Sequence, residues 1–275
     1  MRASLACDQK AFTLIELLLV IGIIGTLAAL LLAALASAKA SAHSTTCKNH
    51  LRQMGIALTM YVDEHQNRYP YYLGPHDPWD DSIEPDNRSY WWSKLVPYYP
   101  VKWADRAYHC PGYKAAVAGR LGTSPRAYPV GSYAYNVRGA RSWVAGYDDP
   151  KHGIHVRFPL YNFGLGTVVR RAFSFRTTGE AQVKVPSEMF SIGESRFLNE
   201  KANFPEPGGR DELTCGFLRY PANFAFDPAR HGKKYNQLYC DGHVTAMNSW
   251  VLFNPTNSAA MWNYDHEPHP ELWMP

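Results

Sequence analysis

The sequence predicts an α+β fold in which a long N-terminal helix packs on an antiparallel sheet of about four strands. First, neither Gly nor Pro interrupts the chain from Thr26 to Met54, where the helix formers Ala and Leu are common. Second, short aromatic or β-branched runs such as Ser132–Asn136 and Glu188–Glu194 are typical of strands. Third, residues 138–180 hold many Gly and Arg with little periodicity, and we expect them to form a large irregular insertion.

The N-terminal helix is expected over about residues 12–64. Its second half carries an apolar stripe with spacings of 4, 3, 4 and 3, which is the period of one helical face. The stripe consists of Cys47, Leu51, Met54, Leu58 and Tyr61. Such a stripe predicts packing against the rest of the chain. The lone Gly55 weakens the helix without ending it, and Pro70 follows its expected end.

The first half of this helix is apolar enough to cross a membrane. Leu17–Ala36 has 20 positions without a charge, about 30 Å of helix, which is the thickness of a bilayer core. No second run of this kind follows, which excludes a polytopic transporter or channel. Arg2 and Lys10 favour a cytoplasmic N-terminus. A cleaved signal peptide is the alternative, but the long run and Glu16 at its start argue against it.

The residues around Glu16 carry a family resemblance. Lys10–Leu18 reads KAFTLIELL and resembles the start of type IV prepilins and type II secretion pseudopilins. The resemblance implies cleavage between Ala11 and Phe12 by a prepilin peptidase, followed by N-methylation of Phe12. It also implies that Glu16 meets the N-terminal amine of a neighbouring subunit during assembly. The family almost always has Gly at the position of Ala11. A chance match in an ordinary signal anchor is the competing interpretation.

A second resemblance lies near the C-terminus. His231 is followed after nine residues by Asp241-Gly242, which is similar to the processing-associated region of a large pilin-like family. The residues on either side of Asp241-Gly242 predict a hairpin, with strands at 236–240 and 243–247.

His231 is expected to form hydrogen bonds across this hairpin and to fix the entry of the chain. A metal site that combines His231, Asp241 and His243 is the alternative, since imidazole and carboxylate groups both bind metals. His152 with His155 and His266 with His269 lack the four-ligand spacing of a structural zinc site. No metal is assigned from the sequence.

The sequence has five cysteines. Cys7 would leave with the leader, and the other four are expected outside the cytoplasm, where disulfides can form. Four cysteines allow three pairings. Because Cys47 is on the helix face and Cys110 begins a loop, the first expectation is Cys47–Cys110 together with Cys215–Cys240. Free buried thiols are the alternative.

No catalytic frame is visible in the sequence. It has no Gly-x-Ser-x-Gly, no Walker loop, no His-Glu-x-x-His and no dinucleotide glycine fingerprint. Lys and Arg total 28 against 24 Asp and Glu, without a basic block, so nucleic-acid binding is not evident. We therefore expect neither enzymatic activity nor a cofactor.

The resemblance implies a structural subunit, a pilin or pseudopilin of a type II secretion or type IV pilus-like filament. Its parts would be a cytoplasmic leader at 1–11, the helix at 12–64 with a transmembrane segment at 17–36, and an extracytoplasmic domain at 65–275. Its partners would be the prepilin peptidase, other subunits and the inner membrane. The alternative is a membrane-tethered module that binds glycans or surface polymers through the aromatic loops of Tyr69–Trp103.

Overall fold

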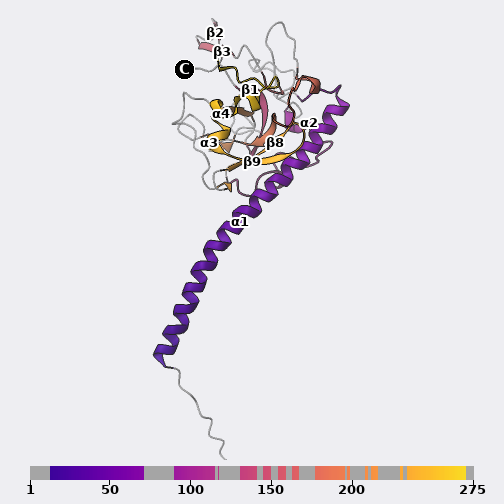
Figure 1. Cartoon of the computed structure of the whole chain (residues 1–275). Coiled ribbons are helices and arrows are strands. Elements are labelled where there is room, and N and C mark those ends of the chain that lie inside the picture. Colours follow the sequence, from indigo (N-terminus) through magenta and orange to yellow (C-terminus); the bar gives the residue numbers. More distant parts are fainter. Residues whose placement is uncertain are drawn as a thin grey trace, which may run out of the picture. The chain divides into compact units, whose positions relative to one another are not determined.

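The computed structural model describes residues 13–70, 90–114, 117, 131–140, 145–149, 154–158, 163–166, 177–195, 197–198, 208–209, 212–215, 230–231 and 234–270 (Figure 1). By internal contacts the chain divides into two compact units, Met1–Ala42 and His43–Pro275. Its elements are α1 (Leu14–Glu64), α2 (Trp91–Lys94), η2 (Arg106–Tyr108), β1 (Tyr133–Ala140), β2 (Ala145–Asp149), β3 (Ile154–Phe158), η3 (Glu180–Gln182), β4 (Phe190–Glu194), β5 (Phe197–Leu198), β6 (Gly208–Gly209), β7 (Glu212–Cys215), β8 (Lys234–Tyr239), β9 (Val244–Asn248), α3 (Ser249–Leu252) and α4 (Pro255–Trp262).

The predicted N-terminal helix is present as α1, a single element of 51 residues. In the first unit every described side chain from Leu14 to Lys39 is exposed. In the second unit the helix buries one face, and the five stripe residues predicted from the sequence are all buried there. The change occurs at Cys47, the first buried residue of α1.

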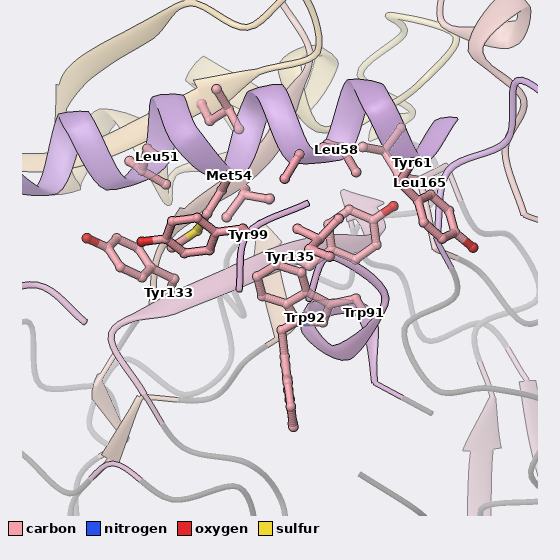
Figure 2. Close-up of a cluster of buried hydrophobic side chains, with 14 of the residues drawn as sticks. Leu51, Met54, Leu58, Tyr61, Trp91, Trp92, Tyr99, Tyr133, Tyr135 and Leu165 are labelled. Atoms are coloured by element: carbon pink, nitrogen blue, oxygen red, sulfur yellow. The ribbon is translucent and has the colours of Figure 1, made fainter. Parts of the chain in front are cut away.

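The stripe of α1 packs on an aromatic core. Figure 2 shows Met54 and Leu58 among the rings of Trp91, Tyr133 and Tyr135, and all five side chains belong to one buried cluster. The rings of Trp91 and Tyr135 stack with centroids 5.5 Å apart. Aromatic side chains of this size contribute most of the apolar area that a domain buries.

The central sheet has five strands in the order β7-β1-β4-β8-β9. Strands β1, β4, β8 and β9 pair antiparallel, each with the next in this order. This confirms the α+β prediction of a long helix with an antiparallel sheet. The fifth strand, β7, was not predicted and pairs parallel to β1. Within the region expected to be an irregular insertion, β2 and β3 form a separate antiparallel pair.

Both faces of β8, an interior strand of the sheet, are buried. Leu238 faces the cluster that includes the α1 stripe. Tyr235 and Tyr239 of the same strand belong to a second cluster with Leu252 of α3 and Trp262 of α4. This alternation follows from the opposite orientation of successive side chains in a strand.

The two short C-terminal helices of this second layer were missed by the sequence analysis, although their caps are readable. Asn248 accepts a hydrogen bond from the backbone N–H of Trp250 at 2.9 Å, and Asn254 accepts one from that of Thr256 at 3.1 Å. Pro255 then occupies the first turn of α4, where proline is favoured. The signal was therefore Asn as an N-cap, twice in seven residues.

Candidate functional site

The N-terminal end of α1 holds the residue singled out for assembly. The backbone N–H and the hydroxyl of Thr13 both donate to Oε2 of Glu16, at 2.9 and 2.6 Å. The N–H of Glu16 in turn lies 3.3 Å from Oγ1 of Thr13, which accepts from it. This reciprocal pair is a capping box, in which two side chains satisfy N–H groups of the first helical turn. Ala11 and Phe12, the expected cleavage site, lie outside the described residues.

The helix beyond Glu16 presents an apolar surface on all sides. Its exposed large side chains in this stretch are Leu17, Leu18, Leu19, Val20, Ile21, Ile23, Ile24, Leu27, Leu30, Leu31, Leu32 and Leu35, and Leu14 and Ile15 just before Glu16 are exposed as well. Among the described residues α1 is the one helix long and apolar enough to cross a bilayer. A helix that is apolar all round needs an apolar environment, such as lipid or neighbouring helices.

His231 lies inside the second unit, where it contacts a buried carboxylate. Its Nε2 is 2.8 Å from Oε1 of Glu194 and 3.3 Å from Sγ of Cys110. The backbone N–H of Asn236 donates to Oε2 of Glu194 at 2.8 Å. Glu194 is the last residue of β4 and Asn236 lies in β8. His231 therefore ties the entry of β8 to the end of the neighbouring strand.

The other two motif residues lie at the opposite end of β8. Asp241 Oδ1 accepts from the backbone N–H of His243 at 3.1 Å and lies 2.6 Å from its Nδ1. Since β8 spans Lys234–Tyr239, a rise of about 3.3 Å per residue separates its two ends by about 17 Å. The structure therefore pairs Asp241 with His243 and leaves His231 with Glu194. The nine residues between His231 and Asp241 therefore contain the whole of β8.

The turn between β8 and β9 is one residue longer than the predicted Asp241-Gly242 pair. The N–H of Gly242 donates to the carbonyl of Tyr239 at 3.0 Å. The N–H of Tyr239 donates to the carbonyl of His243, also at 3.0 Å. Gly242 has φ +90°, a conformation that favours glycine. The loop is thus Cys240–Gly242, a three-residue turn with glycine in the last place.

One expected cysteine pair is present and the other is not. Cys47 and Cys110 form a disulfide between α1 and the loop after η2. Cys240 is a free thiol, so the expected Cys215–Cys240 pair is wrong. The reason is topological: Cys215 ends β7, and two strands separate β7 from β8. At about 4.8 Å per strand the two residues stand roughly 14 Å apart, too far for a disulfide.

The free thiol of Cys240 has a partner of its own. It is hydrogen-bonded to the hydroxyl of Tyr69, and its desolvation raises the pKa of Cys240 to about 12. A thiol that stays protonated at neutral pH is a poor nucleophile. Cys240 is therefore a free thiol, as the alternative expected, but it is only partly buried.

The aromatic segment proposed for ligand binding contributes to the core in its described part. Tyr90, Trp91, Trp92, Tyr99 and Trp103 are all buried. The rings of Trp92 and Trp103 stack with centroids 5.4 Å apart. Residues 71–89 of this segment lie outside the described residues. Buried aromatic stacks of this kind stabilise a domain and leave no ring face for a sugar.

The paired histidines also have separate partners. His266 Nε2 lies 3.1 Å from Oε2 of Glu188, and His269 Nε2 lies 2.8 Å from Oδ2 of Asp265. His152 lies outside the described residues. Among the described residues these histidines do not form a group of three or more metal-binding side chains.

Comparison with known families shows that residues 7–32 match the prokaryotic N-terminal methylation motif. This is a prepilin-type N-terminus. It supports a type IV pilin-like protein that is processed by prepilin peptidase and has a structural role. The prepilin-type N-terminus and the apolar part of α1 are consistent with a single-pass anchor in the inner membrane. No curated protein and no solved structure matches the chain.

Proposed function

We propose that the chain is a structural subunit, a pilin or pseudopilin, of a type II secretion or type IV pilus-like filament. Cleavage between Ala11 and Phe12 would free the amine of Phe12, which is then methylated. The observation that carries the proposal is Glu16, a carboxylate at the start of an otherwise apolar helix surface. An isolated carboxylate is costly in hydrocarbon and needs a cation.

The helix itself offers Glu16 no nearby cation. Between residues 13 and 42 Glu16 is the only acidic residue, and the first basic residue after it is Lys39. At 1.5 Å per residue the two are about 35 Å apart along the helix. The N-terminal amine of a neighbouring subunit is the cation that filament assembly would bring to this depth, so Glu16 would set the register between subunits.

The Cys47–Cys110 disulfide supports an extracytoplasmic position for the second unit. Structural disulfides persist in oxidising compartments and are rare in the cytosol. Together with basic residues ahead of the apolar run, this favours a cytoplasmic leader and a folded domain on the other side of the membrane.

The first experiment is intact mass spectrometry of the protein from membrane and sheared-surface fractions. A chain that begins with N-methyl-Phe12 supports the proposal. A chain that begins near Lys39 would show that the helix is removed as a signal peptide, and the proposal would fail. An uncut chain would leave a static anchor and would favour the membrane-tethered binding module.

A pair of variants then tests assembly. Glu16→Ala should abolish filaments or secretion while the near-ultraviolet circular dichroism of the aromatic core stays unchanged. Asp63→Ala is the matched control, because it removes an exposed acidic residue from the other end of the same helix. Equal filament yield from the two variants would contradict a role for Glu16 in assembly.

A further inference from the structure

Four side chains with metal-binding atoms converge inside the second unit. They are Cys47 of α1, Cys110 of the loop after η2, Glu194 at the end of β4 and His231 before β8. One ligand atom from each lies within 4.8 Å of the other three. This group is separate from Glu16 and from the hairpin turn. The group includes His231 of the C-terminal motif, but neither Asp241 nor His243 belongs to the group.

The group is buried and held in place. Cys47, Cys110 and Glu194 are 0% exposed, and the side chain of His231 is 2% exposed. Oγ of Ser132 accepts from the backbone N–H of Cys110 at 2.8 Å. The backbone N–H of Asn236, as described above, holds the carboxylate of Glu194. Such outer contacts orient metal ligands and strengthen binding.

We propose that reduction of the Cys47–Cys110 disulfide turns this group into a binding site for a thiophilic divalent cation such as Zn²⁺. Two thiolates, one imidazole and one carboxylate form a donor set that suits Zn²⁺. With Zn–S of about 2.3 Å and Zn–N or Zn–O of about 2.0–2.1 Å, ligand atoms of a tetrahedral site stand about 3.3–3.8 Å apart. The four ligand atoms already lie within 4.8 Å of one another. On metal binding the widest separations would close to this range, while the two sulfurs released from their bond, and the 2.8 Å pair of His231 Nε2 and Glu194 Oε1, would move apart to it.

The chemistry of the conversion balances in two steps. An external dithiol of the thiol–disulfide oxidoreductase class supplies two electrons: its thiols become a disulfide as Cys47 and Cys110 become thiols. Zn²⁺ then binds both sulfurs as thiolates and two protons leave to water. His231 binds through Nε2 as the neutral ring, with its proton on Nδ1, and Glu194 binds as the carboxylate.

The resulting site has a net charge of −1, and a buried cation lies close by. Arg230 immediately precedes His231 and is fully buried. Its Nη1 donates to the carbonyl of Ser195 at 3.3 Å, next to Glu194 in the chain. A permanent positive charge in a low-dielectric interior offsets such an excess.

The disulfide and the metal therefore exclude each other, yet both fasten α1 to the loop at Cys110. In an oxidising compartment the disulfide would join α1 to this loop. Where thiols are kept reduced, the bound cation would join them and would also hold the ends of β4 and β8 together. The same four residues would thus hold the domain together on either side of the membrane.

The test uses the full chain in detergent, reduced under argon with a phosphine and titrated with Co²⁺. We expect one Co²⁺ per chain, with the sulfur-to-cobalt charge-transfer and visible bands of a tetrahedral site, and displacement by Zn²⁺. The oxidised chain should show neither band. A reduced chain that stays folded without these bands would overturn the proposal. So would a reduced chain that unfolds and is not refolded by Zn²⁺.

Variants separate this site from the other thiols. His231→Asn should weaken Zn²⁺ binding by more than the roughly 10–100-fold that loss of an outer partner costs. Asn keeps the left-handed backbone of His231, whose φ is +48°. The control Cys240→Ser should bind Co²⁺ as the wild type does. Loss of the cobalt bands in Cys240→Ser, or their survival in Cys47→Ser with Cys110→Ser, would contradict the assignment.

Discussion

Nε2 of His231 lies 2.8 Å from Oε1 of Glu194, and both side chains are almost completely buried. The two residues are separated by 37 positions in the sequence. The pair joins a residue three positions before the start of β8 to the last residue of β4, at the end of β8 away from the β8–β9 turn. It therefore gives His231 a structural role that is independent of any metal.

Loss of this contact should destabilise the second unit. His231→Asn removes a hydrogen bond to a buried carboxylate, and we expect the free energy of unfolding to fall by about 2–3 kcal/mol. Urea denaturation of the oxidised chain, followed by near-ultraviolet circular dichroism, measures this change. The control is His243→Ala, whose contact with Asp241 is partly exposed and should contribute less than about 1 kcal/mol. Equal losses in both variants would refute the interpretation.

Gly193 lies close against the side chain opposite it in the sheet. It pairs with Gln237 of β8, and a Cβ at position 193 would clash with the side-chain amide of that glutamine. Gly193→Ala should therefore lower the free energy of unfolding by about 1–3 kcal/mol through overpacking. Gln237→Ala added to Gly193→Ala should recover part of the loss, which a double-mutant cycle in urea would reveal. Strict additivity would contradict the proposed clash.

The Cys47–Cys110 disulfide should contribute strongly to stability. It closes a loop with a sequence separation of 63, for which chain entropy predicts about 4 kcal/mol. Cys47→Ala with Cys110→Ala should lower the free energy of unfolding by about this amount. The measurement is made with EDTA, so that no metal replaces the bond. An unchanged denaturation midpoint of the wild type upon addition of dithiothreitol would argue against this contribution.

His109 should make the second unit sensitive to acid. Burial lowers the pKa of His109 to about 4 from a model-peptide value of 6.5. Its Nε2 donates to the carbonyl of Trp103 at 2.7 Å, and its Nδ1 accepts from the N–H of Ser132 at 3.1 Å. Between about pH 6.5 and 4 this histidine is protonated in the unfolded chain but neutral in the folded chain. The free energy of unfolding therefore falls as the pH drops toward 4.

The loss over this range should reach about 3 kcal/mol, since one pKa unit corresponds to about 1.4 kcal/mol. Urea denaturation at pH 7, 6, 5 and 4 measures it. His109→Phe isolates this residue from the other ten histidines. The variant should be less stable at pH 7 but should lose less stability on acidification. A wild type and a variant with parallel pH profiles would rule out His109 as the acid-sensitive group.

Ala11 should limit the rate of N-terminal processing. The prepilin resemblance implies Gly before the cut, and Ala11 adds a Cβ next to the scissile bond. Ala11→Gly should raise the fraction of mature chain in the membrane, measured as the ratio of uncut to N-methyl-Phe12 forms by intact mass spectrometry. Ala6→Gly, a similar change five residues further upstream, should leave the ratio unchanged.

Local patterns predicted the elements that local physics determines. The stripe of α1, its membrane-length apolar run and the β8–β9 hairpin all followed from periodicity and turn residues. The position of β7 did not, because it pairs in parallel with β1 across a long connection. The short helices α3 and α4 were missed because they are too short to show a helical pattern of apolar residues, so that only their Asn caps indicated them.

The site was predicted less completely than the fold. The pairing of Cys47 with Cys110 followed from a helix face and a loop, but the second pairing required the strand order, which no local pattern contains. The contact between His231 and Glu194 is likewise a product of the order β4-β8. Glu194 was assigned to a strand from the sequence, and nothing nearby indicated that its carboxylate is buried against an imidazole.

No side chain of α1 is buried before Cys47, whereas one face of the helix is buried from Cys47 onward. Substitutions in its two halves are therefore limited by different surroundings. A new side chain at Leu27 is exposed to whatever surrounds the anchor, so it must suit lipid or the helices of other subunits. A new side chain at Leu51 must suit only this chain's own core. If the proposed filament role holds, the anchor is constrained by the other subunits, whereas the domain can diverge as long as it folds around the same helical stripe. Homologous subunits would then be recognisable by their first turns long after their domains had ceased to align.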